Sequence, residues 1–124
     1  MNQPYLLIST ASDLLRVQAR HVLYIQSDGN YSMLYLTNGE ARLITAQLGQ
    51  LEQLIDRQFA GEEPTFVRIG KTLIINIRYV FYINPTKQQL QMLDIRQTRH
   101  DLSVSQRALK ELKERLEQQG DEVI

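Results

Sequence analysis

Short apolar runs separated by turn residues constrain the fold of this chain more than any other feature. Such runs cover residues 5–8, 14–17, 21–25, 31–36, 41–44, 66–69, 73–75, 79–83, 89–95 and 99–104. They are rich in β-branched and aromatic residues, which favour strands. Most connections between neighbouring runs have hairpin length, and hairpins join antiparallel strands. The sequence therefore predicts a mainly β fold of antiparallel sheets built from short strands.

Turn-forming residues support this pattern in the first half of the chain. Ser27-Asp28-Gly29-Asn30 ends one run with residues that favour turns. Asn38-Gly39 follows the next run, and Asn-Gly is the preferred pair for a type I′ hairpin turn. We therefore expect residues 31–36 and 41–44 to pair across that turn.

Two segments depart from the strand pattern and predict one inserted helix and one C-terminal helix. Apolar residues recur at helical spacing, first at Leu48, Leu51, Leu54 and Ile55 and again at Leu109, Leu112 and Leu116. Thr45 stands where it can cap the first helix. Ser103 and Gln106 fit a capping box for the second helix, and Gly120 fits its end.

Composition points to one intracellular domain. The 124 residues can bury a core, and the absence of cysteine excludes disulfides and thiolate metal sites. No apolar run approaches the roughly 20 residues of a membrane span. The start, Met1-Asn2-Gln3-Pro4, lacks the basic region of a signal peptide. We expect a cytoplasmic protein without membrane contact.

The chain lacks the residue clusters that most enzymes need. His21 and His100 are the only histidines, and no His, Asp or Glu cluster has metal-ligand spacing. Gly70-Lys71-Thr72 resembles the end of a phosphate-binding loop, but the required earlier glycine is missing and a strand follows. We predict neither catalysis nor a cofactor or metal. His100 reads as a solvated side chain or a phosphate contact.

Net charge is zero, yet its distribution is uneven. Residues 1–65 carry a net charge of −3, residues 66–100 carry +5, and residues 101–124 carry −2. The basic middle holds six cations and a single acid, Asp94. A basic segment of this kind is a modest indication of a surface that faces a polyanion.

The segment Phe66–Asn76 concentrates this charge at a break between two strands. Arg68, Gly70, Lys71 and Thr72 separate two apolar runs, and Gly70 permits backbone angles closed to other residues. Such a bend can present a guanidinium, an ammonium and a hydroxyl to a polyanion. It can equally be an ordinary turn with solvated cations.

Four segments in order resemble the LytTR family, the DNA-binding domain of many bacterial response regulators. Residues 22–31 resemble the family's I-x-Y-I-x-x-x-x-x-Y, and residues 66–76 resemble its F-x-R-I-H-R-S-Y-I-V-N. Asn38-Gly39 with the following helix is similar to the family's central part, and residues 102–105 to its I-x-V-S-R. The resemblance runs from His21 to Leu116. It implies an N-terminal strand region over 1–20, the family domain over 21–118 and a tail over 119–124.

The resemblance implies a sequence-specific transcription regulator that contacts successive major grooves through loops. The contacts would come from the loop 27–32, the bend 68–72 and the helix start 105–107. The residues expected to contact DNA are Asn30, Tyr31, Arg68, Lys71, Thr72, Lys87, Ser105, Gln106 and Arg107.

Side-chain chemistry suggests a role for each. Arg68 or Arg107 could donate two hydrogen bonds to a guanine edge, and Asn30 could pair with adenine. Lys71 suits a phosphate or a guanine, while the hydroxyls of Thr72 and Ser105 and the ammonium of Lys87 suit the DNA backbone. Tyr31 is equally a surface contact or a half-buried core residue. For Asn76 we favour a structural role.

The chain departs from the family pattern in ways that affect these roles. Gly70-Lys71-Thr72 replaces the usual His-Arg-Ser or His-Asn-Ser at the bend, which removes an aromatic donor. Ser105-Gln106 replaces Ser-Arg, and Arg107 lies one position on, which turns the guanidinium by about 100° around a helix. Gln106 could then be the base reader in place of Arg107.

The expected partner is double-stranded DNA, as direct repeats that bring two copies together. The resemblance also implies signalling from a histidine kinase, although the 20 residues before His21 cannot hold a receiver domain. The chain is thus a stand-alone regulator or an excised effector domain. The alternative is a β-rich protein-interaction or ligand-sensing module that has lost DNA binding, which the neutral net charge favours.

Overall fold

The computed structural model describes residues 4–62, 64–120 and 124. The elements in chain order are β1 Tyr5–Ser9, β2 Leu14–Gln18, the 3₁₀ turn η1 Ala19–His21, β3 Val22–Asp28, β4 Tyr31–Leu36, β5 Ala41–Ile44, α1 Leu48–Gln58, β6 Phe66–Ile69, β7 Leu73–Asn76, the 3₁₀ turn η2 Ile77–Tyr79, β8 Val80–Asn84, β9 Gln89–Leu93, β10 Arg99–Ser103 and α2 Gln106–Gln119. The predicted mainly β fold with one inserted and one C-terminal helix is confirmed.

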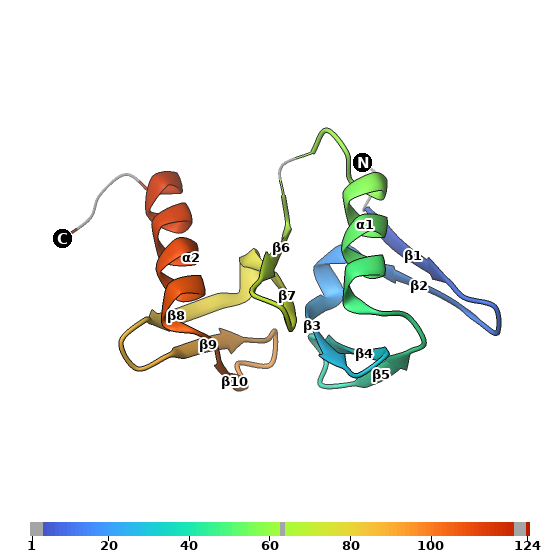
Figure 1. The fold of residues 1–124 in the computed structure, drawn as a ribbon, viewed down its shortest axis with the longest axis horizontal. Coiled ribbons are helices and arrows are strands. Elements are labelled where there is room, and N and C mark those ends of the chain that lie inside the picture. The colour runs from blue at the N-terminus through green and yellow to red at the C-terminus, as the bar shows by residue number, and fades with distance from the viewer. Residues whose placement is uncertain (1–3, 63, 121–123) are drawn as a thin grey trace.

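The strands form three antiparallel sheets. The central sheet has five strands in the order β5-β4-β3-β7-β6. A hairpin of β1 and β2 makes the second sheet, and β10-β9-β8 makes the third. Figure 1 shows the β6–β7 hairpin between the two helices, with α2 beside the β8–β10 sheet and α1 beside the β1–β2 hairpin.

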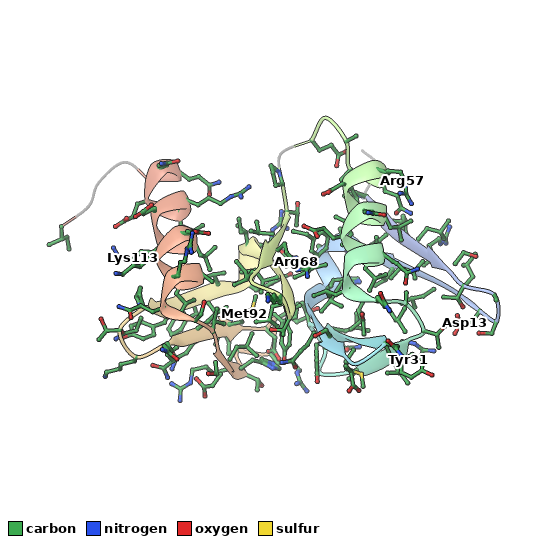
Figure 2. All side chains as sticks on the ribbon, in the orientation of Figure 1. Asp13, Tyr31, Arg57, Arg68, Met92 and Lys113 are labelled. Carbon is green, nitrogen blue, oxygen red and sulfur yellow. The ribbon has the colours of Figure 1, made fainter. Side chains whose placement is uncertain are left out.

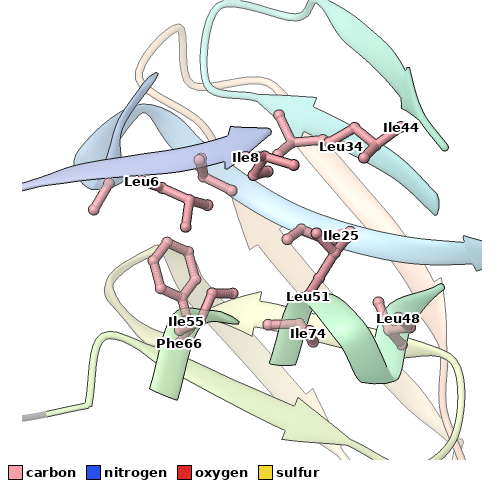
Figure 3. Close-up of a cluster of buried hydrophobic side chains, with 12 residues drawn as sticks. Leu6, Ile8, Ile25, Leu34, Ile44, Leu48, Leu51, Ile55, Phe66 and Ile74 are labelled. Atoms are coloured by element: carbon pink, nitrogen blue, oxygen red, sulfur yellow. The ribbon is translucent and has the colours of Figure 1, made fainter. Parts of the chain in front are cut away.

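The middle of the central sheet is buried on both faces, because each face supports its own core. On one face Ile25 and Ile74 pack with β1 and α1, as Figure 3 shows for Leu6, Ile8 and Leu51. On the other face the core joins β3 and β7 to β9, β10 and α2. A bulge in β3 between Val22 and Tyr24 turns two consecutive residues, Leu23 and Tyr24, toward this second core.

The helix starts differ from the predicted ones. α1 begins after Gln47, whose backbone N–H donates to Oε1 of Gln50 at 2.8 Å, so Thr45 is not its cap. α2 begins after Ser105, whose hydroxyl oxygen accepts from the N–H of Ala108 at 3.3 Å. Ser103 cannot cap α2 because it still pairs with Gln89 in the sheet. Gly120 ends α2 as predicted.

The hairpin of β4 and β5 has the predicted strands but another turn. Only Gly39 has a positive φ, +93°, whereas a type I′ turn needs positive φ at both central residues. The N–H of Gly39 donates to Leu36 O at 3.1 Å and the N–H of Leu36 donates to Glu40 O at 2.8 Å. This is the three-residue turn with a left-handed glycine in its last position. A Cβ added at residue 39 would collide with the guanidinium of Arg96.

Strand β9 ends at Leu93, two residues before the predicted end. The carboxylate of Asp94 accepts from the N–H of Arg96 at 2.8 Å and of Thr98 at 3.0 Å. These bonds close a turn, so Ile95 is exposed instead of paired. Of the residues that the structure describes, none forms a helix that is both long and apolar enough to cross a membrane.

Candidate nucleic-acid interface

One end of the central sheet collects two of the three predicted contact segments. Strand β3 ends and β4 begins at the loop 28–31, and β6 ends and β7 begins at the bend 70–72. Because β3 pairs with β7, these two connections are neighbours, and the N–H of Ser27 donates to Thr72 O at 2.9 Å. The sheet topology thus places loop 28–31 beside bend 70–72.

The bend 70–72 is a three-residue connection shaped by glycine and by Arg68. Gly70 has φ +59°, the left-handed region that glycine enters without strain. Arg68 donates from Nε to Gly70 O at 3.1 Å and from Nη2 to Lys71 O at 3.1 Å. Its Nη1 pairs with Oε1 of Glu52 in α1 at 2.8 Å. Figure 2 shows Arg68 between the two helices.

The loop 28–31 is tied to the start of α1. Oδ1 of Asn30 accepts from Nε2 of Gln47 at 3.3 Å, while Tyr31 as a residue is 47% exposed. The buried hydroxyl of Ser32 donates to Ala46 O at 2.8 Å. These contacts hold the side chains of both neighbours of Tyr31 and leave Tyr31 itself exposed.

The β8–β9 turn and the start of α2 form a second group. Lys87 lies in this turn, and the N–H of Val104 donates to Gln88 O at 3.2 Å. That bond brings the turn next to Ser105, Gln106 and Arg107. The guanidinium of Arg107 lies 3.7 Å from the carboxylate of Glu111, and both side chains are exposed.

A hollow lies between the bend and α2. Its lining comes from the end of β6 with the bend and from one face of α2: Val67, Arg68, Ile69, Gly70, Ala108, Glu111, Leu112 and Arg115. Helix α2 therefore neighbours the bend from Ala108 onward, and the bend neighbours loop 28–31. Eight of the nine predicted contact residues are exposed, and Arg68 is the partly buried exception.

Asn76 holds the fold together, in agreement with the structural role favoured from sequence. Its side chain is fully buried, and Nδ2 donates to Val22 O at 2.9 Å and to Ala19 O at 3.4 Å. Its Oδ1 accepts from the N–H of Arg78 at 3.0 Å. Asn76 thus joins the start of β3 to both 3₁₀ turns.

His100 is not a freely solvated side chain, which was one of its two sequence interpretations. Its Nε2 lies 3.0 Å from Oδ2 of Asp94, a side chain with no exposed surface. Burial opposes ionisation of this carboxyl, but hydrogen bonds from His100, Thr98 and Arg96 outweigh it and lower the pKa of Asp94 to about 2. Asp94 is the lone acid of the basic segment 66–100, and that isolation is the sequence signal that could have revealed this site.

The fold and the exposed segments define a class: a β-rich domain that presents loops and one helix start at its surface. The sequence matches the LytTr DNA-binding domain family over residues 12–117. The chain therefore belongs to this family of DNA-binding domains, which confirms the resemblance found in the motifs.

Solved structures share this fold, among them one of low sequence identity. It is the LytTr DNA-binding domain of a protein assigned as a methyl-accepting/DNA response regulator from Bacillus cereus. The identity is 16% and the TM-score 0.61, with 93% of this chain and 98% of that chain covered. No curated protein matches the chain at a significant level.

Proposed function

We propose that the chain is a bacterial transcription regulator that binds a specific site in double-stranded DNA. Loop 28–31, bend 70–72 and the start of α2 would enter successive major grooves, and two copies would occupy a direct repeat. The proposal extends to signalling through a histidine kinase in the cytoplasm. It adds no catalytic step, cofactor or metal.

The observation that carries the proposal is that the three segments are joined in series. The bond from Ser27 to Thr72 links the loop to the bend, and the hollow between β6 and α2, lined by Gly70 and Ala108 among others, places the bend beside the helix that begins at Gln106. The loop and the bend are connections of the central sheet, which is buried on both faces, and α2 packs on one of these faces. A rigid framework with polar side chains at its surface loops is suited to reading base edges.

The free cations support the same surface. Within the described residues, neither Lys71 nor Lys87 forms an ion pair with an acid, and both are exposed. Arg107 has only an exposed partner, Glu111, and exposed pairs of this kind are worth about 0–1 kcal/mol. These three side chains can therefore turn to DNA at little cost.

Selection from a random double-stranded DNA library tests the proposed function. We expect an enriched motif repeated in direct orientation, with an affinity that falls linearly with the logarithm of salt concentration as counterions are released. A selection without enrichment, or binding that does not change with salt, would contradict the proposal and favour a protein-interaction module.

Replacing Lys71 should weaken DNA binding without affecting the fold. We expect Lys71→Ala to lower affinity roughly 10-fold and to reduce the salt slope by about 1 if the ammonium neutralises a phosphate. If Lys71 reads guanine, the variant should instead lose preference at one base pair. Fluorescence anisotropy with the selected DNA at several salt concentrations measures both.

Lys113→Ala is the matched control. Lys113 lies on the side of α2 away from the β6–β7 hairpin, where its Nζ pairs with Glu117 at 2.7 Å (Figure 2). Its removal should leave affinity and salt slope unchanged. Equal losses from both variants would show that net charge, and not the bend, governs binding.

A further inference from the structure

Each of the three guanidinium nitrogens of Arg68 donates a hydrogen bond to an acceptor within the protein. Nε and Nη2 donate to the carbonyls of Gly70 and Lys71, both at 3.1 Å, and Nη1 pairs with Glu52 at 2.8 Å. Three of the five guanidinium N–H groups are thereby committed within the protein, which restricts how Arg68 can turn toward a guanine edge. Its surroundings therefore favour a role for Arg68 within the protein over the predicted role as a base reader.

The three bonds determine the shape of the bend. Residues 70–72 connect two strands that pair up to Ile69 and Leu73, and the two bonded carbonyls belong to the connection itself. A short loop that orders on binding loses affinity through lost conformational freedom. The bonds from Arg68 hold this loop in one conformation before any partner binds. The ion pair with Glu52 in turn holds the Arg68 side chain in place.

Helix α1 supports both neighbouring segments. Glu52 lies in its second turn and holds the bend through Arg68, while Gln47 at its start bonds to Asn30 of loop 28–31. The helix itself is anchored in the core through Leu48, Leu51 and Ile55. The bend and loop 28–31 are thus both held by α1, which the core keeps in place.

We infer that Arg68 is a positioning residue: with Glu52 of α1 it presets the bend that presents Lys71, and it does not contact DNA. The inference rests on the proposed function. It implies that Glu52, an acid, increases DNA affinity by holding Arg68, although its negative charge by itself repels a polyanion.

Glu52→Gln tests the inference because the two roles of Arg68 predict opposite signs. If Glu52 anchors Arg68, the variant should lower affinity for the selected DNA roughly 5-fold, despite the loss of a negative charge. If Arg68 contacts DNA and Glu52 merely competes for it, the variant should raise affinity. A rise, or no change, overturns the inference.

Glu117→Gln is the matched control for this measurement. Glu117 is an acid of similar exposure, paired with Lys113 on α2. We expect its variant to leave affinity unchanged or to raise it slightly, as removal of an acid should. Losses of equal size from both variants would overturn the inference.

Two substitutions of Arg68 separate positioning from contact. Arg68→Ala should lower affinity about 10-fold with the salt slope unchanged, because no phosphate contact is lost. Arg68→Lys should not rescue binding, since one ammonium cannot hold three acceptors in a plane. A slope reduced by about 1, or rescue by lysine, would identify Arg68 as a DNA contact.

A measurement without DNA keeps the inference separate from the proposed function. In the free protein, the NMR signal of the Arg68 Nε–H should exchange slowly with solvent. In Glu52→Gln its exchange should accelerate, and order parameters of residues 70–72 should fall. Unchanged order in the variant would overturn the positioning role, whereas failure of the wild type to bind any DNA would overturn only the proposed function.

Discussion

Asn76→Ala should lower the free energy of unfolding by roughly 3 kcal/mol, because buried backbone groups lose their hydrogen-bond partner. The N–H of Arg78 loses its acceptor, and the carbonyl of Val22 loses the donor 2.9 Å away. The side chain has no exposed surface, so water cannot replace it without opening the junction between β3 and β7. Urea denaturation followed by circular dichroism measures the loss.

Two comparisons separate this effect from a role in DNA binding. Asn38→Ala also removes an amide that accepts a backbone N–H, that of Glu40 at 2.9 Å, but in an exposed turn, and should cost less than about 1 kcal/mol. Asn76→Asp keeps the acceptor for Arg78 but removes both donors and buries a charge, so it should be at least as destabilising as alanine. An unchanged denaturation midpoint with reduced DNA affinity would show that Asn76 is a DNA contact.

Strand positions were predictable because local residue types decide them. Residues 31–36, 41–44 and 66–69 form strands with the predicted bounds. Turn geometry and helix starts were less predictable from the sequence, because they depend on tertiary partners. Arg96 packs against the Gly39 turn, and Ser103 stays in the sheet because Gln89 pairs with it.

In the candidate site too, local features were predictable from the sequence and tertiary contacts were not. The sequence predicts which residues are exposed polar groups at turns, and Lys71 and Lys87 are exposed as expected. It could not predict that Arg68 is already occupied, because Glu52 lies sixteen residues earlier in the chain, on another element. A sequence motif shows that a cation is present, but the acid that pairs with it within the protein is decided by how the elements pack.

Asp94, like Asn76, is a buried polar side chain that forms several hydrogen bonds. Its carboxylate accepts from two backbone N–H groups and lies 3.0 Å from His100 and 3.5 Å from the guanidinium of Arg96. Because Arg96 also covers Gly39, this cluster connects the β9–β10 turn with the β4–β5 turn. Tyr24 faces the ring of His100 edge-on, with the ring centroids 6.2 Å apart.

Acid should therefore destabilise the protein partly through Asp94. Its pKa is lowered from 3.8 to about 2, so the folded state binds this proton less readily than the unfolded chain. The stabilisation is present above about pH 4 and is lost as pH falls toward 2. Urea denaturation at a series of pH values should show this loss in the wild type.

Asp94→Asn should flatten the acid dependence between about pH 4 and 2 and lower stability at pH 7 by roughly 2 kcal/mol, since charge-assisted hydrogen bonds are lost. Asp94→Ala should cost more, because the N–H groups of Arg96 and Thr98 then lack an acceptor. Asp101→Asn, at an exposed acid 3.9 Å from Arg99, should change neither quantity by more than about 0.5 kcal/mol. If Asp94→Asn kept the wild-type acid dependence, the carboxylate would not be the group whose protonation loosens this turn.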